Sequence, residues 1–242
     1  MPATGKSAQA RPRTRREIQL EVRSALAWLE KHGSVRNREG MARYAITAPK
    51  VFGVPMGKIQ ALARRLGKDH ALAAALWETG WYEARLLTAF VAEPGRLTSA
   101  EMDRWCRDFD NWAVCDTLCF HLFDRSPLAF RKVSQWAGRR PEFVRRAAFA
   151  LLASLALHDK KTPDAAFVRC LPLIETAAED ERNFVKKAVS WALRGVGKRS
   201  PHLKASATAV ARRLAESKRP APRWVGKGAL KELTRTAQRR RE

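Results

Sequence analysis

The sequence predicts an all-α protein with the architecture of a HEAT-like repeat α-solenoid, in which antiparallel helix pairs stack and present a concave basic surface. Apolar residues recur at helical spacing through most of the chain, and no stretch shows the sustained alternation of a β-strand. Residues 143–148 (FVRRAA) also match residues 184–189 (FVKKAV) at an offset of 41 residues. A period near 40 with two or three helices in each unit is typical of HEAT arrays. Chance matching of alanine-rich helices is the alternative.

The N-terminal half divides into helices at glycine and proline. An amphipathic helix is expected over 17–32, where Gly33 stops it, and a shorter segment over 38–47 ends before Pro49. A third helix starts at Pro55, since proline is favoured in the first helical turn, and it ends at Gly67. Helices over 70–79 and 82–92 form a hairpin broken near Gly80.

The later helices are more regular. Thr98 and Ser99 introduce a helix over 99–108, and Asn111 is a suitable N-cap for the next, which runs to 123. Further helices are expected over 127–137, 141–157, 163–177, 181–197 and 201–216, and a short, loosely attached one over 223–239. The predicted organisation is a disordered basic arm (1–14), a repeat domain (15–216) and a basic C-terminal extension (217–242).

The charge balance points to nucleic acid. The chain carries 47 Lys and Arg against 24 Asp and Glu, a net charge of +23. Residues 1–16 and 217–242 together account for only about half of this excess, so the middle of the chain is basic as well. Cations in a folded surface release counterions from DNA when they contact its phosphates. A basic ribosome-associated protein is the alternative.

The cysteines indicate neither a metal site nor a disulfide framework. Cys106, Cys115, Cys119 and Cys170 include no CxxC pair, so we expect small buried side chains in a reduced, cytoplasmic protein that needs no metal or cofactor. No apolar run reaches the length of a membrane span, and the N-terminus lacks the apolar stretch of a secretory signal. Neither a membrane location nor export is therefore expected.

One stretch combines residues suited to chemistry. After Asn111, Trp112 and Asp116 are four residues apart, so an indole and a carboxylate project side by side from one helix. On the helix over 181–197, Trp191 follows Lys187 by one turn. If the repeats stack, two indoles flank a carboxylate on a basic surface. A half-buried tryptophan beside an aspartate paired to arginine is the plainer alternative.

Alkylated DNA suits this arrangement. A purine alkylated at N3 or N7 is cationic, so the base leaves without a general acid, and the sugar left behind becomes positive. Indole faces attract cations by about 0.5–2 kcal/mol, and a carboxylate could stabilise the sugar and orient water. Arg85, Arg146 and Lys187, at equivalent turns of the repeats, would form a row of cations suited to a duplex backbone.

The chain resembles the AlkD family of DNA alkylation repair glycosylases over residues 20–235. The resemblance rests on residues 76–77 (LW), 82–85 (YEAR), Asn111, Trp112 and Asp116, 143–148 (FVRRAA) and 187–194 (KAVSWALR). It implies a HEAT-like fold that excises N3- and N7-alkylpurines while the lesion stays stacked, unlike the base flipping of most such enzymes.

The resemblance also assigns roles. It implies that Trp112 and Trp191 contact the lesion, that Asp116 is the catalytic carboxylate, and that Arg146 binds phosphate beside the lesion, or Arg145 if the register shifts by one. Lys186 and Arg194 are expected to be solvated or to face phosphate. Many relatives have an acidic residue where this chain has Ala113, and some relatives of this fold have no glycosylase activity.

The expected function is that of a monomeric, monofunctional DNA glycosylase acting on duplex DNA with alkylated purines and leaving an abasic site, in the cytoplasm of a bacterium. Two alternatives stay open. One is a non-catalytic protein that binds damaged or branched DNA through the same surface. The other is a HEAT scaffold that binds an acidic protein partner.

Overall fold

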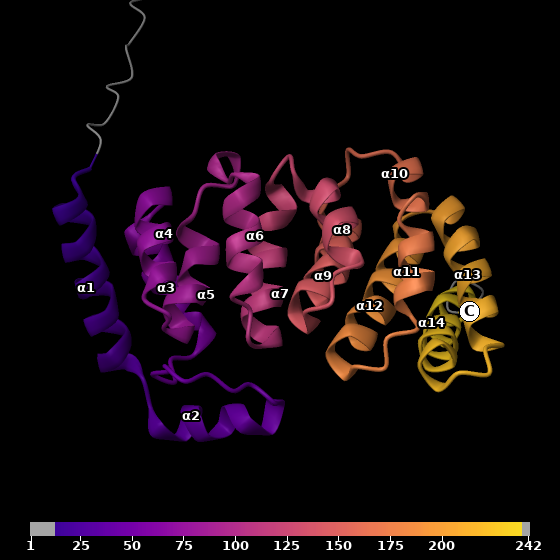
Figure 1. Cartoon of the computed structure of the whole chain (residues 1–242), viewed down its shortest axis with the longest axis horizontal. Coiled ribbons are helices and arrows are strands. Elements are labelled where there is room, and N and C mark those ends of the chain that lie inside the picture. Colours follow the sequence, from indigo (N-terminus) through magenta and orange to yellow (C-terminus); the bar gives the residue numbers. More distant parts are fainter. Residues whose placement is uncertain (1–12, 239–242) are drawn as a thin grey trace, which may run out of the picture.

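The computed structural model describes residues 13–238, and all regular secondary structure in this part of the chain is helical, without a strand (Figure 1). The all-α solenoid prediction is confirmed. The first helices are α1 (Arg15–His32), α2 (Val35–Met41), the 3₁₀-helix η1 (Ala42–Tyr44), α3 (Met56–Leu66), α4 (His70–Glu78) and α5 (Tyr82–Val91). The middle comprises η2 (Pro94–Arg96), α6 (Ser99–Arg107), α7 (Trp112–His121), η3 (Phe123–Arg125), α8 (Ala129–Ala137) and α9 (Glu142–His158). The last are α10 (Asp164–Val168), α11 (Leu171–Ala177), α12 (Asn183–Arg199), α13 (Pro201–Ala215) and α14 (Pro220–Gln238).

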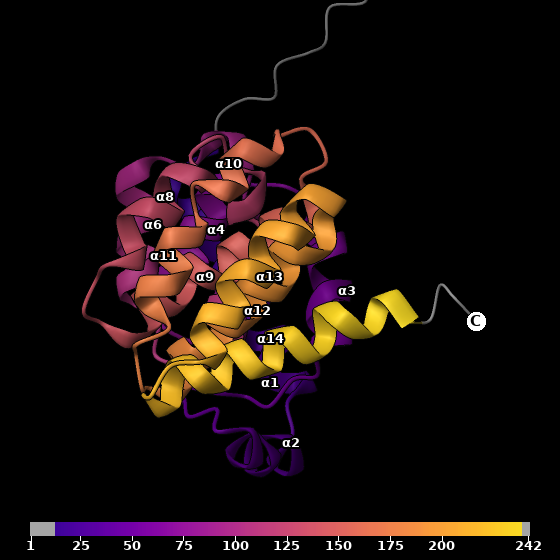
Figure 2. The same cartoon turned by 90° about the vertical axis from the view of Figure 1, so that its right-hand side faces the viewer.

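The helices stand side by side in two layers (Figures 1 and 2). Helices α5, α7, α9, α12 and α14 contact one another in succession and form one layer. Helices α4, α6, α8, α11 and α13 form the other, and most of them pack on the following helix of the first layer. Phe143 and Phe184, the first residues of the sequence repeat, lie at the starts of α9 and α12 with ring centroids 5.4 Å apart. The repeat therefore corresponds to neighbouring helices of one layer.

Helix α9 is the centre of the stack. It packs against α7, α8 and α12, and its side chains are buried along nearly its whole length. Small residues such as Ala147 and Ala148 allow this, because they let helices approach on several sides at once. The four cysteines are buried as expected, and Trp77, Trp105 and Trp136 lie in the core.

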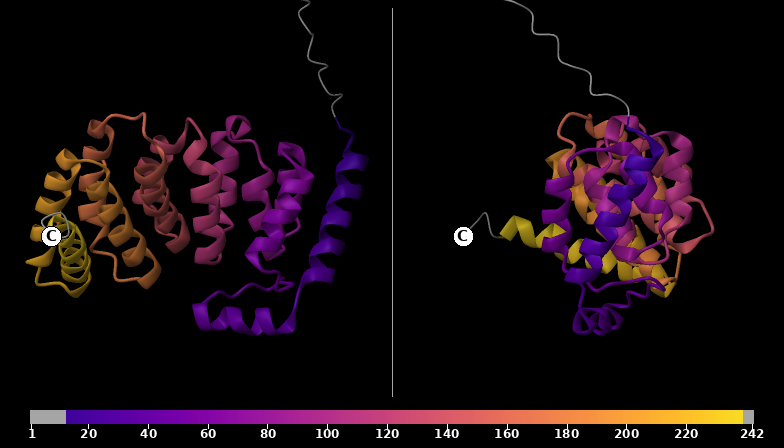
Figure 3. Two further views of the ribbon diagram at one scale, coloured as in Figure 1. Left: turned by 180° about the vertical axis from the view of Figure 1, so that it is seen from behind. Right: turned by 90° about the vertical axis from the view of Figure 1, so that its left-hand side faces the viewer.

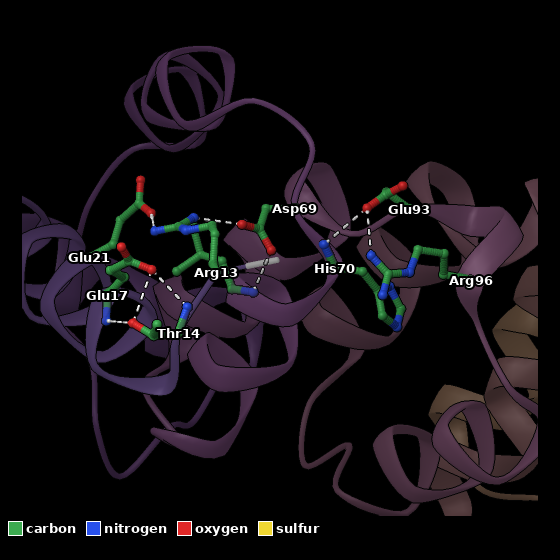
Figure 4. A network of polar contacts seen from close by, with 9 residues as sticks. Arg13, Thr14, Glu17, Glu21, Asp69, His70, Glu93 and Arg96 are labelled. Carbon is green, nitrogen blue, oxygen red and sulfur yellow. Dashed lines mark hydrogen bonds and ion pairs between the residues drawn. The ribbon is translucent and has the colours of Figure 1, made fainter. Parts of the chain in front are cut away.

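The N-terminal end is closed by a polar network (Figure 4). Thr14 caps α1 through a reciprocal capping box with Glu17. Arg13 pairs with Glu21 of α1 and with Asp69, the N-cap of α4, so it joins these two helices. Residues 1–12 of the predicted basic arm lie outside the described residues, and Arg13 and Thr14 belong to the folded part.

Two helices differ from the prediction for local reasons. The segment 163–177 is divided into α10 and α11, because Pro172 near the start of α11 cannot donate a hydrogen bond to continue the preceding helix. The segment expected over 38–47 begins earlier, at the N-cap Ser34, and passes from α2 into η1. No residue of α2 or η1 is buried, and this segment lies across the base of the stack (Figure 3).

The prediction of a short, loosely attached C-terminal helix is wrong. Helix α14 has 19 residues and buries Val225, Ala229 and Leu233 against α12 and α13. It runs crosswise to the stack, and its C-terminal end extends past the other helices (Figures 2 and 3). The packed helical core therefore continues beyond residue 216 into the segment 217–238. None of the described helices combines the length and the apolar character needed to cross a membrane.

The packing of α14 depends on a glycine. A Cβ atom at position 226 would lie 2.6 Å from the carbonyl oxygen of Ala211 and still closer to the backbone nitrogen of Ala215. We expect Gly226→Ala to separate α14 from α13 and to lower the free energy of unfolding by about 1–3 kcal/mol, as overpacking does. Urea unfolding measures this change.

Gly228→Ala is the matched control. The nearest atom to its added methyl group is Ser190 Oγ, at 3.8 Å. Since alanine is a better helix former than glycine by up to about 1 kcal/mol, this variant should be as stable as the wild type or more so. Equal destabilisation by both substitutions would contradict the close approach at Gly226.

Candidate active site

Helix α7 presents one stripe of side chains to the solvent. Along it, Val114, Cys115, Leu118 and Cys119 are buried, whereas the residue pairs 112–113, 116–117 and 120–121 are half-buried. Asn111 begins the helix as its N-cap, accepting a 3.0 Å hydrogen bond from the backbone N–H of Val114. Trp112, Asp116 and Phe120 therefore follow one another at single-turn intervals on the open side of α7.

Asp116 is held by Arg146 from the neighbouring helix α9. Arg146 Nε donates to Asp116 Oδ1 at 2.9 Å, and Nη2 donates to Oδ2 at 2.7 Å, which is a bidentate pair. The third nitrogen, Nη1, donates to the carbonyl oxygen of Phe184 on α12 at 2.7 Å. The side chains of Arg146 and Asp116 are 7% and 16% exposed. Arg146 is thus mainly a positioning residue in this structure, and its predicted contact with phosphate stays a prediction.

Burial raises the pKa of Asp116 above its ordinary value, and the guanidinium of Arg146 opposes this rise without cancelling it. An adjacent arginine by itself lowers the pKa of an aspartate. That contribution is present, but the loss of solvation outweighs it. Asp116 also raises the pKa of Arg146 by more than burial lowers it, so the guanidinium keeps its charge.

The two predicted tryptophans lie at the two ends of the stripe. The Trp112 Nε1–H donates a 2.8 Å hydrogen bond to the carbonyl oxygen of Tyr44 in η1. Trp191 of α12 stacks on Phe120, with ring centroids 4.6 Å apart and planes 9° from parallel. Asp116 lies between the two aromatic groups, each about one helical turn away along α7. The carboxylate thus lies along α7 between Trp112 and the Phe120–Trp191 stack.

Tyr44 and Phe120 belong to this site, and the sequence analysis missed both. Phe120 has a recognisable signal, since it continues the four-residue spacing of Trp112 and Asp116. Tyr44 has none, because its contact spans 68 residues of sequence and uses a backbone atom. The side chain of Tyr44 is 69% exposed.

Some of the predicted DNA-binding cations are paired with groups of the protein, and others are open to the solvent. Arg85 Nη1 donates to the Asp108 carbonyl at 3.1 Å and lies 3.7 Å from Asp110, so it supports the loop before α7. Arg145 pairs with Asp180 at 2.8 Å, and Arg194 pairs with Glu232 of α14. Hydrogen bonds from Arg182 and Arg145 lower the pKa of Asp180 to about 2 despite its burial.

The lysines of α12 are more open. Lys187 is exposed, and Lys186 lies over the ring of Trp224 at 5.1 Å from its centroid. Of the three cations expected in a row, only Lys187 faces the solvent, because Arg85 and Arg146 are turned toward groups of the protein. Their roles in DNA binding stay predictions.

One solved structure supports this architecture. A solved structure described as belonging to "a new family of proteins related to the HEAT-like repeat DNA glycosylases with affinity for branched DNA structures" matches with a TM-score of 0.75. The two chains are 20% identical, and the match covers 89% of this chain and 94% of that one. A designed armadillo repeat protein matches only slightly, with a TM-score of 0.33 and 11% identity over 72% of this chain and 91% of its own. No curated protein matches the chain in sequence.

A family model provides the assignment. The model described as "DNA alkylation repair enzyme" matches residues 25–233, from within α1 to within α14, and so covers most of the chain. It includes Tyr44, Trp112, Asp116, Arg146 and Trp191. The chain therefore belongs to the DNA alkylation repair enzyme family.

Proposed function

We propose that the protein is a monofunctional DNA glycosylase that hydrolyses the N-glycosidic bond of cationic N3- and N7-alkylpurines in duplex DNA. The observation that supports this most is the position of Asp116, an aspartate fixed by two hydrogen bonds from Arg146 and placed between Trp112 and the Phe120–Trp191 stack. A carboxylate flanked by aromatic faces is complementary to positive charge. The substrate is cationic before the reaction, and its sugar becomes cationic during it.

The reaction needs little from the protein besides electrostatics. As the bond between C1′ and the purine nitrogen breaks, its electron pair neutralises the alkylated ring, and positive charge moves to the sugar. A water molecule then adds to C1′ and releases a proton, which leaves an abasic site and a neutral base. Asp116 would stabilise the sugar cation and orient this water, while Arg146 holds the carboxylate in one orientation.

The open position of the site favours a lesion that stays in the duplex. Trp112, Asp116 and Phe120 lie along a partly exposed helix stripe, which a groove of DNA can approach from outside. No step of the proposed reaction requires the base to enter a pocket. The protein would therefore avoid the few kcal/mol that base flipping costs.

Binding of branched or damaged DNA without catalysis is the second candidate. It is supported by the solved relative whose description names affinity for branched DNA. The same basic helical surface would serve, and Asp116 would then be a structural partner of Arg146. The two candidates differ in whether the protein releases a base, a step in which the first candidate uses the carboxylate of Asp116.

Replacing Asp116 with asparagine separates these two functions. We expect Asp116→Asn to reduce single-turnover release of 7-methylguanine from methylated duplex DNA by at least about 100-fold, because a preorganised charge is lost. Its affinity for the same DNA should stay within a few-fold of wild type. Glu216→Gln, which removes an exposed carboxylate at the end of α13, is the control and should release base normally.

The alternative outcomes are informative as well. Normal release by Asp116→Asn would remove the catalytic role from this carboxylate. If the wild type releases neither N7- nor N3-methylated bases but binds branched DNA, the non-catalytic function is the better account.

The pH dependence tests the state of Asp116. The reaction needs the ionised carboxylate, so the rate constant for base release should fall as the pH decreases through the pKa of Asp116. Since burial raises this pKa, the fall should occur above the ordinary aspartate value of about 3.9. In Arg146→Gln the opposing cation is gone, and the fall should move to still higher pH.

Release rates at saturating protein between pH 4.5 and 8, corrected for spontaneous depurination, measure both effects. An unchanged profile in Arg146→Gln would show that another group controls the rate.

A further inference from the structure

A basic pocket of about 430 Å³ lies beside the candidate site. Its wall includes Gln60 and Arg64 from α3, Lys68 from the turn after α3, Phe90 from α5, His121 from α7 and Arg125 from η3. Three of these six side chains are basic, and two more can donate hydrogen bonds. The residues that line the pocket include no carboxylate.

The three cations of this pocket are not neutralised by the protein. Within the described residues, Arg64, Lys68 and Arg125 form no ion pair, in contrast to Arg146 and Arg194. Lys68 Nζ donates one hydrogen bond, to the carbonyl oxygen of Ala92 at 2.9 Å. Burial, followed by the positive charge of Arg125, lowers the pKa of Lys68. The pocket therefore holds cations that repel one another.

The nearest acidic residues are engaged elsewhere. Glu93 accepts hydrogen bonds from the backbone of His70 and from Arg96 (Figure 4). Asp124 accepts hydrogen bonds from Ser154 at 2.6 Å and from His158 at 2.7 Å. Glu93 still raises the pKa of Lys68 in part through its charge, but neither carboxylate lines the pocket. The pocket therefore keeps a net positive charge that is complementary to an anion.

The pocket and the candidate site share the open stripe of α7. His121 is the last residue of that stripe, next to Phe120, and its ring lies 4.8 Å from the ring of Phe90. His121 lies five positions after Asp116, which is about 7.5 Å along a helix axis. For a duplex whose axis runs along α7, this distance corresponds to about two base-pair steps, at 3.4 Å each.

We propose that this pocket binds a backbone phosphate of the DNA, about two base pairs from the target nucleotide. The proposal rests on the proposed function only in taking DNA as the ligand of this face, since it does not require base release. Guanidinium groups from Arg64 and Arg125 and the ammonium group of Lys68 suit a phosphate, which offers several acceptor oxygens in one place. The contact would fix the register of the duplex relative to Asp116.

Charge removal tests the pocket by the salt dependence of binding. Each phosphate contact contributes about 0.9 to the slope of log affinity against log salt concentration. We expect the triple variant Arg64→Gln, Lys68→Gln, Arg125→Gln to lower this slope by about one to two for undamaged duplex DNA. The control is Arg107→Gln, Arg131→Gln, Arg212→Gln, which removes the same charge from exposed positions on α6, α8 and α13, helices of the other layer. Equal slopes for the two triple variants would overturn the proposal.

Replacing single phosphates with uncharged methylphosphonates shows where on the DNA the pocket makes its contact. In duplexes with one 7-methylguanine, single methylphosphonates are placed at each of the five phosphates on either side of the lesion. Wild-type binding should weaken several-fold at one or two positions near the second base-pair step. The pocket variant should lose little further affinity at those positions, whereas the control triple variant should lose as much as the wild type. A position-independent profile, or the same loss in all three proteins, would overturn the proposal.

These measurements separate the pocket from the glycosylase proposal. A wild type without base release that still shows the phosphate effect would leave the pocket in place and reject the enzyme. Base release by the wild type, with the same salt slope in the pocket variant as in the wild type, would support the enzyme and reject the pocket proposal. If deoxynucleoside monophosphate binds the wild type but not the pocket variant while the slopes for DNA agree, the pocket takes free nucleotides and the proposal is wrong.

Discussion

The rest of the site depends on the three-way contact of one buried guanidinium. Arg146 lies on α9, holds Asp116 of α7 with two nitrogens and contacts a carbonyl of α12 with the third. Burying a charge is costly, and a good pair with further hydrogen bonds offsets much of that cost. The result is that one side chain sets the distances among three consecutive helices of the layer. The carboxylate it holds then has a fixed place relative to aromatic groups from two of those helices.

Much of this arrangement follows from local sequence. The helices, their caps and the repeat of α9 and α12 depend on residues a few positions apart, which spacing rules describe well. The pairing of Trp112 with Asp116 on one helix face is equally local. The pairing of Asp116 with an arginine does not by itself indicate catalysis. A catalytic site and an ordinary ion pair beside a half-buried tryptophan both predict it. The flanking stack of Phe120 and Trp191 is what distinguishes the site from an ordinary ion pair.

The parts that sequence analysis missed are long-range. Tyr44 reaches Trp112 across 68 residues, and Arg194 finds its partner Glu232 across 38. Neither contact leaves a periodic pattern in the sequence. The packing of α14 was underestimated because its apolar residues are few, and a close approach at Gly226 compensates for them. The free cations of the pocket could not be told from the paired ones, because a count of Lys and Arg does not show which carboxylates are near.

The burial of the four thiols has a chemical consequence for a member of an alkylation repair family. Agents that alkylate purines also attack thiolates, and a thiol reacts only when it is exposed and deprotonated. Burial raises the pKa of Cys106 and Cys119 well above the ordinary range, and it raises the pKa of Cys170 to about 11. Cys115 is closed to the solvent beside them. The four thiols of the folded protein are therefore poor targets for the electrophiles that damage the DNA.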